Sequence, residues 1–255
     1  YAFAFRRLTA CVSVDFLLTP RYLFENLGGF DLRFSPAYCA VDYCLSMWQM
    51  GREVVYEPDA LVLHLNGPGT QESRMNAESI RINQSKIEQK HQAWLTANHL
   101  EEGKINIPRA LVARYRGKRI LFVDDRIPHP YLGSGFPRSH SIIRRLAQGG
   151  NYVTCYPVRF SNDSSNAARS ALGCEVEAIS TLGPAGMEGF LRRRAAAYNV
   201  LWISRPHNLE FLASIRSAHP AWFSGMRMIY DAEAIFCLRE VEKARIMGKE
   251  IPLEM

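Results

Sequence analysis

From residue 118 onward, short apolar runs alternate with longer stretches that favour helices, and this alternation constrains the fold more than any other feature. The runs read as strands are residues 119–123, 152–158, 175–179, 200–204 and 227–230. The segments read as helices are residues 138–148, 164–172, 186–197, 208–218 and 238–248. Because strands that alternate with helices pair in parallel and carry the helices on the two faces, we expect a doubly wound α/β domain over residues 118–255.

The first part of the chain, residues 1–104, carries a less regular mixture of elements. We expect a long helix over residues 70–100, whose stripe of Ile80, Ile87 and Trp94 packs across the rest of this domain. Glycines stand where helices should end, since glycine adopts the left-handed cap conformation at little cost. The other predicted elements are strands at residues 12–18, 53–56 and 60–64, a helix from Pro20 to Leu27 that ends at Gly28-Gly29, and a helix at residues 41–50 that ends at Gly51.

Residues 105–117 are charged and lack apolar periodicity, so we interpret them as a linker between the two domains. The 255 residues are enough for two small domains. The chain begins at Tyr1 without an initiator methionine or a signal-peptide pattern, and we therefore expect it to be a piece of a longer protein.

The net charge of +6 is concentrated in the second part, where residues 118–255 hold 18 Lys+Arg against 13 Asp+Glu. Such a balance suits ligands that carry phosphate, or peripheral association with an anionic membrane surface. No basic run is interleaved with aromatic residues, so nucleic acid is not an expected partner. The six cysteines are scattered and form no Cys-x-x-Cys pair, which favours reduced thiols. We therefore expect a cytoplasmic location, either free in the cytoplasm or at the inner face of the membrane.

Three motifs follow one another early in the chain: Leu27-Gly28-Gly29-Phe30-Asp31, then Ser35-Pro36-Ala37-Tyr38, then Val41-Asp42-Tyr43-Cys44-Leu45. Gly51, Val54-Val55-Tyr56-Glu57-Pro58 and His64 come after them. In this order they resemble the C-terminal half of the catalytic domain in family 2 nucleotide-sugar glycosyltransferases, which has the GT-A fold. The resemblance implies transfer of a sugar from a nucleotide-sugar donor to a glycan acceptor.

Inverting transferases of this kind use a carboxylate to deprotonate the acceptor hydroxyl and a divalent metal, Mn or Mg, to neutralise the leaving diphosphate. The family's acidic pair is replaced here by Cys39-Ala40, so Asp42 is the remaining candidate for the catalytic base. A plain alternative is that Asp42 stands at a helix start and is stabilised by the helix dipole. The Asp-x-Asp motif that would hold metal and diphosphate does not occur in the chain.

The same resemblance assigns roles to residues around Asp42. His64 matches a histidine that is a metal ligand in some family members, although a histidine after an apolar strand is also common as a packing or capping residue. The segment Gly28, Gly29, Phe30 and Asp31 is expected to shape the acceptor side of the pocket, and it also serves as a helix cap and turn.

The second domain carries another set of ordered motifs: the strand and loop at residues 120–135, the segment at residues 198–205, and Ile229-Tyr230-Asp231-Ala232-Glu233 followed by Arg239. They resemble the N-terminal Rossmann-like domain of a GT-B glycosyltransferase near the family 4 group. Residues 120–125 also resemble the start of response-regulator receivers. A receiver is not favoured, because the predicted third strand contains no Asp and residue 231 is Asp where a receiver needs Lys.

Two loops of the second domain are predicted to bind substrate. Gly133-Ser134-Gly135 lies between the first strand and a helix, where glycines let backbone N–H groups approach a phosphate. Arg205 and His207 follow a later strand, at the edge where the resemblance places the acceptor, and His207 could act there as a base or as a contact to the acceptor.

The two resemblances together imply a tandem glycosyltransferase fragment that adds hexosyl units to a growing bacterial surface glycan, and whose isolated chain is inactive. Two other readings stay open: a catalytically inactive scaffold or acceptor-binding module, and a nucleotide-binding Rossmann-like protein without transfer activity.

Overall fold

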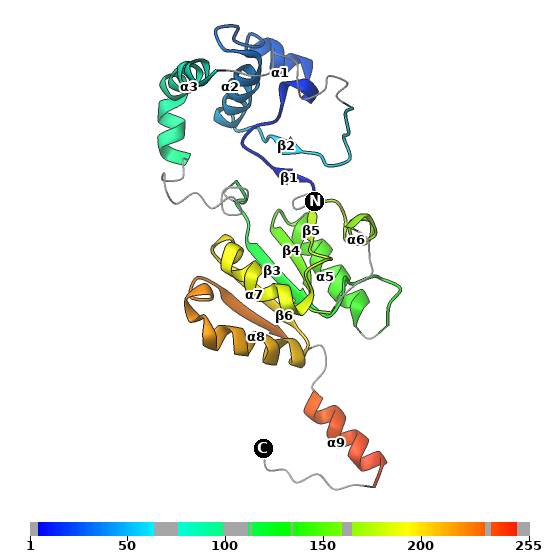
Figure 1. The fold of residues 1–255 in the computed structure, drawn as a ribbon. Helices are drawn as coiled ribbons and strands as arrows, with labels where there is room; N and C mark the ends of the chain where they lie inside the picture. The colour runs from blue at the N-terminus through cyan, green and yellow to red at the C-terminus, as the bar shows by residue number, and fades with distance from the viewer. Residues whose placement is uncertain are drawn as a thin grey trace. The chain divides into compact units, whose positions relative to one another are not determined.

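The computed structural model describes residues 5–63, 76–98, 112, 114–133, 135–159, 165–232 and 236–248 (Figure 1). The chain divides into two compact units, Tyr1–Arg114 and Tyr115–Met255. The division falls inside residues 105–117, where the sequence predicts a linker, but most of that segment lies outside the described residues. None of the described helices is both long and apolar enough to cross a bilayer.

The second unit contains a five-stranded parallel sheet in the order β5-β4-β3-β6-β7, flanked by helices (Figure 1). The strands are β3 (Arg119–Asp124), β4 (Tyr152–Pro157), β5 (Val176–Ala178), β6 (Val200–Ser204) and β7 (Arg227–Asp231). The helices are α5 (Phe136–Gln148), α6 (Ser165–Leu172), α7 (Gly183–Arg194), α8 (Pro206–Ala218) and α9 (Phe236–Ile246), with short 3-10 turns η3 (Ala195–Ala197) and η4 (Pro220–Trp222). This is a Rossmann-like α/β arrangement, and the predicted parallel sheet is confirmed.

Strand β3 is the centre of the sheet, because it pairs with β4 on one side and with β6 on the other. Along the chain, β4 and then β5 are added on one side of β3, and β6 and then β7 are added on its other side. In open α/β sheets, ligands bind outside the carboxyl ends of the strands at the point where this order reverses. That point lies here between the ends of β3 and β6.

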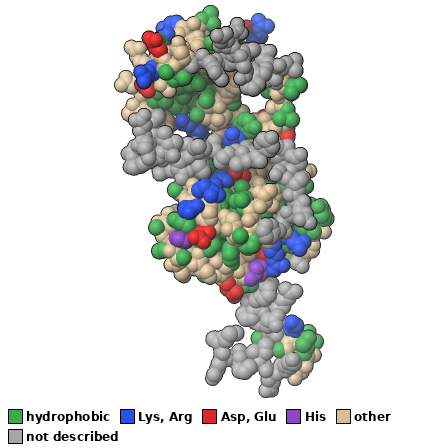
Figure 2. Space-filling view, in the orientation of Figure 1, with side chains coloured by type: hydrophobic (Ala, Val, Ile, Leu, Met, Phe, Trp, Pro, Cys, Tyr) green, Lys and Arg blue, Asp and Glu red, His purple; other side chains and the backbone are tan. Residues whose placement is uncertain are grey.

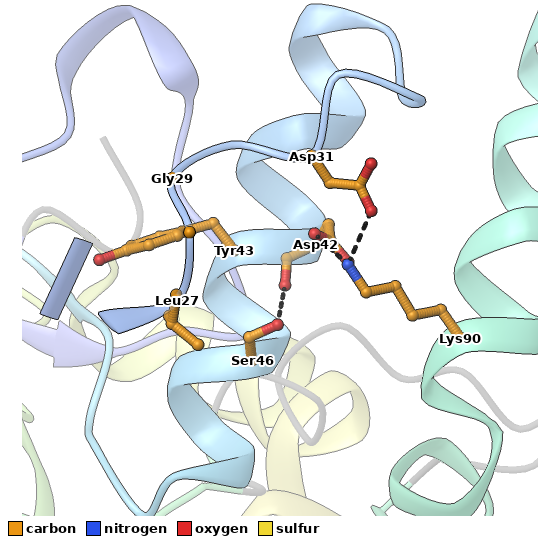
Figure 3. A pocket seen from close by; sticks show the side chains of 8 residues that line it. Leu27, Gly29, Asp31, Asp42, Tyr43, Ser46 and Lys90 are labelled. Carbon is orange, nitrogen blue, oxygen red and sulfur yellow. Dashed lines mark hydrogen bonds and ion pairs between the residues drawn. The ribbon is translucent and has the colours of Figure 1, made fainter. Parts of the chain in front are cut away.

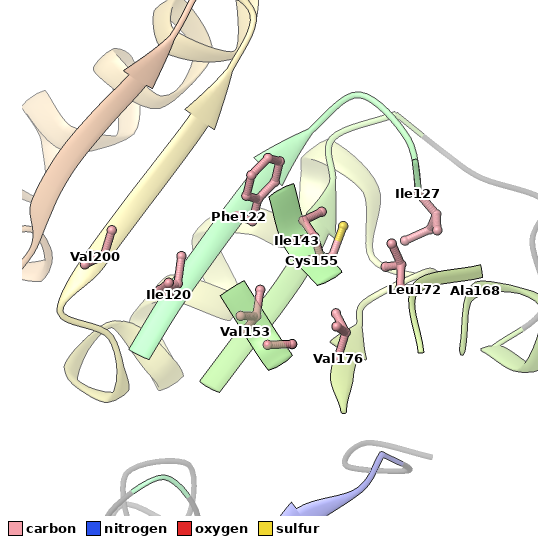
Figure 4. Packing of buried hydrophobic residues seen from close by; sticks show 11 residues of the cluster. Ile120, Phe122, Ile127, Ile143, Val153, Cys155, Ala168, Leu172, Val176 and Val200 are labelled. Atoms are coloured by element: carbon pink, nitrogen blue, oxygen red, sulfur yellow. The ribbon is translucent and has the colours of Figure 1, made fainter. Parts of the chain in front are cut away.

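The core of the second unit lies between β3, β4 and the helices α5 and α6 (Figure 4). Phe122 is fully buried, and its ring stacks on Trp202 of the neighbouring strand with 5.6 Å between centroids. Ile143 of α5 is also fully buried against this cluster. The unbroken apolar run of β3 follows from this position, since a central parallel strand is covered on both faces.

A network of buried polar side chains crosses β4, β5 and α7. The guanidinium of Arg194 donates to both oxygens of Glu177, at 3.0 and 2.7 Å. The hydroxyls of Tyr152 and Thr154 donate to Oε2 of Glu177, at 2.6 and 2.8 Å. The burial of this charged pair is tolerable because each partner is hydrogen-bonded.

The first unit is built from helices α1 (Arg21–Asn26), α2 (Pro36–Gln49) and α3 (Ala77–Asn98), and from a small ribbon of β1 (Arg7–Leu8) and β2 (Val55–Tyr56). The two strands of the ribbon are antiparallel. Ile87 of α3 is buried in a cluster with Phe34, Cys39 and Leu45, and Trp94 packs against the same cluster. Two of the three residues of the predicted stripe, Ile87 and Trp94, therefore face the rest of this unit, whereas Ile80 is not part of the cluster.

Three predictions for the first unit are wrong. Residues 12–18 form no strand; they contain the 3-10 turn η1 (Val14–Phe16), in which the backbone N–H of Asp15 donates to the side chain of Ser13. Residues 60–63 also form no strand, and Leu61 and Leu63 are largely exposed. The helix predicted from residue 41 begins at Pro36 instead, because proline suits the first turn of a helix, where its missing N–H costs nothing.

Candidate functional site

The first candidate site begins where α1 ends. Gly28 and Gly29 both have φ of 78°, a left-handed conformation that glycine adopts without a steric penalty. This double turn brings Phe30 back against the helices, where its ring lies 5.1 Å from Phe24 and 5.7 Å from Tyr43. Phe30 thus holds the turn in place, and Asp31 follows it at the rim of a cavity.

The cavity has a volume of about 200 Å³ and lies between the glycine turn, α2 and α3 (Figure 3). Asp31, Asp42 and Lys90 gather on one side of it, with the ammonium between the two carboxylates (Figure 3). The complete lining is Leu27, Gly28, Gly29, Asp31, Asp42, Tyr43, Ser46 and Lys90. Four of the residues predicted from the sequence, Gly28, Gly29, Asp31 and Asp42, are therefore brought together.

Asp42 is only 4% exposed and is held by two residues of α3. The ammonium of Lys90 lies 2.8 Å from Oδ1 and 2.9 Å from Oδ2. Nε2 of the buried His91 lies 2.7 Å from Oδ1. The amide of Gln49 lies 3.0 Å from Nδ1 of the same ring, so His91 accepts there and donates from Nε2 to Asp42. The carboxylate is thus fixed in both position and orientation.

These contacts contradict the alternative interpretation, in which Asp42 stands at the start of a helix and is stabilised by the helix dipole. Helix α2 begins at Pro36, so Asp42 lies nearly two turns inside it, beyond the reach of the terminal N–H groups. Its burial depends on Lys90 and His91 rather than on the helix dipole. At His91 the backbone of α3 leaves the helical conformation, with φ of −110° and ψ of 16°.

Asp31 lies in a second set of charged contacts at the rim. Arg33 donates to both of its oxygens, at 2.9 and 2.6 Å, and Lys90 donates at 2.9 Å. The hydrogen bonds from Arg33 and then from Lys90 lower the pKa of Asp31 well below its ordinary value. Burial alone would lower the pKa of Lys90, but its bonds to Asp42 and Asp31 outweigh that effect and raise it. Lys90 therefore stays charged.

A divalent metal does not fit between these carboxylates in the observed arrangement. The space between Asp31 and Asp42 is taken by the ammonium of Lys90, which already supplies the positive charge. No group of three or more His, Cys, Asp and Glu side chains suited to a metal occurs within the described ranges. His64, the predicted metal ligand, lies outside them.

A second polar cluster lies in the second unit at the point where the strand order reverses. Figure 2 shows basic, acidic and histidine side chains close together at the lower edge of this unit, where the strands end. Asp124 ends β3 and is fully buried, and Nε of Arg205 donates to its Oδ1 at 2.9 Å. Burial raises the pKa of Asp124, against the opposing effect of Arg205.

Arg205 has φ of 76°, the one positive value of a non-glycine residue among the described parts of the chain. Such a conformation costs about 1–3 kcal/mol and persists only where the surroundings impose it. The backbone N–H of Arg205 donates to the carbonyl of Asp231 at 3.1 Å, and its guanidinium lies 4.3 Å from the Phe136 ring. These contacts turn the chain sharply from β6 into α8.

The first turn of α8 places His207 and Asn208 against Asp125. Nε2 of His207 lies 2.5 Å from Oδ1 of Asp125, and the amide of Asn208 donates to the same oxygen at 3.0 Å. Asn208 is fully buried and also donates to the carbonyl of Ser204 at 2.8 Å. The predicted residues Arg205 and His207 therefore share one cluster with Asp124 and Asp125.

The glycine loop before α5 belongs to the same edge. Gly135 is the N-cap of α5 and has φ of 80°, which requires glycine or a strained residue. Gly133 precedes it, with open space around its Cα, while Ser134 lies outside the described residues. The loop thus stands at a helix N-terminus, as predicted.

The sequence motifs did not identify several residues of the two clusters as site residues. Lys90 and His91 lie in a helix that is notable only for its apolar stripe, and their partner Asp42 is 48 and 49 residues away. Asp125 is visible in the sequence as half of an acidic pair after a strand, but nothing local indicates that it pairs with His207.

Comparisons with protein-family models, with curated proteins and with solved structures found no match to this chain.

Proposed function

We propose that the protein takes part in the transfer of hexosyl units from a nucleotide sugar to a growing bacterial surface glycan. The single observation that carries the proposal is the cavity lined by Gly28, Gly29, Asp31 and Asp42. These residues belong to two motifs that resemble a GT-A transferase and are separated in sequence, yet they surround one polar space. The Rossmann-like sheet of the second unit supports the matching GT-B resemblance.

In the proposed reaction, Asp42 takes the proton of an acceptor hydroxyl. The hydroxyl oxygen then forms a bond to the anomeric carbon of the donor, and the bond from that carbon to the phosphate oxygen breaks. The electron pair leaves with the nucleoside diphosphate. Lys90 and His91 keep the carboxylate oriented toward the cavity.

The second unit is proposed to bind a phosphate-bearing or acceptor ligand at the carboxyl edge of its sheet. Gly133 and Gly135 lie beside the N-terminus of α5, where backbone N–H groups and the helix dipole favour an anion. Arg205 stands on the opposite side of the reversal point, at the start of α8.

The test uses the full-length protein with UDP-, GDP- and dTDP-hexoses and a panel of oligosaccharide acceptors. We expect nucleoside diphosphate to be released only when an acceptor is present. The variant Asp42→Asn should slow the first unit's transfer by about 10²–10⁴-fold, the usual cost of losing a general base. The matched control is Glu25→Gln, which alters an exposed carboxylate paired with Arg21 and should leave the rate unchanged. Absence of acceptor-dependent release with every donor would overturn the proposal.

One observation favours a second candidate function, an acceptor-binding module without catalysis. Both oxygens of Asp42 already accept hydrogen bonds from Lys90, and Oδ1 also contacts His91, so the lone pairs that a catalytic base would offer to an acceptor hydroxyl are engaged by the protein. In that case an oligosaccharide should still perturb the backbone amides of Gly28 and Gly29 in an NMR titration, while transfer is absent. An unchanged spectrum at millimolar oligosaccharide would exclude this alternative.

A further inference from the structure

Arg114, the last residue of the first unit, contacts two tryptophans from different helices. Its guanidinium carbon lies 4.3 Å from the ring centroid of Trp94 in α3 and 5.4 Å from that of Trp48 in α2. Both distances are within the range of cation–π attraction, which reaches about 6 Å. Nη1 of Arg114 also donates to Oδ1 of Asn98, the last residue of α3, at 3.4 Å. This guanidinium link therefore joins α2 to the last turns of α3.

The guanidinium link suits arginine in particular. The side chain of Arg114 is half-buried, and burial lowers its pKa. A guanidinium nevertheless stays charged in proteins, and its planar group can lie against an aromatic face while its N–H groups still donate. Cation–π attraction grows stronger as water is removed from the cation, so partial burial strengthens the contact with the two indoles. The link therefore persists at neutral pH.

The part of α3 that the link holds lies beyond a break in the helix. At His91 the backbone has φ of −110° and ψ of 16°, so α3 consists of two helical parts, residues 77–90 and 92–98. Such a break lets the two parts differ in direction, because the regular hydrogen-bond ladder does not continue through it. Trp94 and Leu95 of the second part pack against the apolar cluster of the unit. Arg114 adds the link from this part to Trp48.

The break falls on the residue that holds the candidate base. His91 lies 2.7 Å from Oδ1 of Asp42, and its Nδ1 accepts from the amide of Gln49 at 3.0 Å. Gln49 adjoins Trp48 in α2, and Trp94 lies one turn after His91 in α3. The same two helical segments therefore carry both the contacts of Asp42 and the guanidinium link. Without the link, the angle at the break is less constrained, and the imidazole turns with the backbone that carries it.

We propose that Arg114 is a positioning residue for the candidate base Asp42, because it fixes the angle of α3 at the break and so keeps His91 on the carboxylate. The inference rests on the proposed function, which gives Asp42 the role of base. Arg114 is not among the residues that line the cavity, so it acts through α3 and the imidazole. A residue from the predicted linker segment 105–117 thereby supports the site.

The first test follows the proton on Nε2 of His91 by NMR in the 255-residue chain. In Arg114→Ala this proton should exchange with water about tenfold faster, the size expected for the loss of a partly desolvated cation–π contact. Arg114→Lys keeps the charge but not the planar group, and it should restore part of the protection. The matched control is Arg116→Ala, which removes an exposed arginine nearby and should leave the exchange unchanged.

A second variant and a second readout separate positioning from general unfolding. Trp94→Phe keeps a smaller aromatic face under the guanidinium, and it should speed the exchange of the His91 proton less than Arg114→Ala does. The backbone amides of α2 from Cys39 to Leu45 should keep their wild-type exchange rates in Arg114→Ala. An unchanged His91 proton in that variant, or an equal acceleration of the α2 amides, would overturn the positioning role.

The effect on transfer is measured with the full-length protein. Arg114→Ala should lower kcat of the first unit's transfer by about 10-fold to 100-fold, with little change in KM, since a small misplacement of a catalytic group costs rate. Arg116→Ala should keep the wild-type rate. A wild-type rate in Arg114→Ala would overturn this inference alone. Faster exchange at His91, together with no transfer by the wild-type protein from any nucleotide sugar, would overturn the proposed function and confirm only the link from Arg114 to His91.

Discussion

The Nε2 atom of His91 lies 2.7 Å from Oδ1 of Asp42, and this contact joins α3 to α2 through two buried side chains. Lys90, the preceding residue, holds the same carboxylate from the rim of the cavity. Two consecutive residues of α3, Lys90 and His91, therefore fix the position of the candidate base Asp42, and Lys90 supplies the positive charge beside it.

Asp42→Asn should destabilise the first unit as well as slow transfer. The amide cannot accept charge-assisted bonds from Lys90 and His91 as strongly, and hydrogen bonds to charged groups are worth about 1.5–3 kcal/mol. Urea unfolding of the chain should show a loss of about that size. Glu25→Gln, at an exposed ion pair, should cost less than about 1 kcal/mol. Equal losses in the two variants would show that the buried contacts of Asp42 contribute nothing.

Gly29→Ala should cost more stability than Gly28→Ala. Both residues have φ of 78°, so each substitution carries the left-handed penalty of about 1–2 kcal/mol. An added Cβ at Gly29 would also meet the Phe24 ring at 3.3 Å, whereas the one at Gly28 meets no atom within 4 Å. Thermal unfolding of the two variants measures the difference. The reverse order would contradict the packing of the turn.

Glu177→Gln should strongly destabilise the second unit. The substitution leaves the buried guanidinium of Arg194 without its counter-charge, and breaking a buried ion pair costs about 3–5 kcal/mol. Glu188→Gln alters an exposed carboxylate paired with His219 and should change the unfolding free energy only slightly. A loss below about 1 kcal/mol for Glu177→Gln would mean that the network does not stabilise the sheet.

Acid should weaken the first unit partly through Asp31. Its pKa in the folded protein is lower than the ordinary value of about 3.9 that it regains on unfolding. The unfolded state therefore binds the proton more readily, and the stabilisation present above that value is lost as the pH falls below it. Asp31→Asn should flatten the fall of stability between about pH 5 and pH 2, and 1 M salt should shrink the difference. Identical acid curves would argue against the contacts of Asp31 with Arg33 and Lys90.

The elements of the second unit could be predicted because each is encoded locally. Residues 120–123 are continuously apolar, since a central strand is buried on both faces, and the predicted strand at residues 200–204 matches β6 as observed. Residues 12–18 and 60–63 carry similar apolar runs but form no strand. An apolar run becomes a strand only when a neighbouring chain segment supplies hydrogen-bond partners, and the sequence does not encode that locally.

The sequence by itself determined the Rossmann-like alternation of the second unit, the glycine turn at residues 28–29 and the candidate role of Asp42. Only the tertiary structure decided that Asp42 lies inside a helix against Lys90 and His91, and that Asp125 pairs with His207. Periodicity and turn chemistry act between near neighbours in the chain. The partners of a buried carboxylate are chosen by packing, which brings together residues 48 to 82 positions apart.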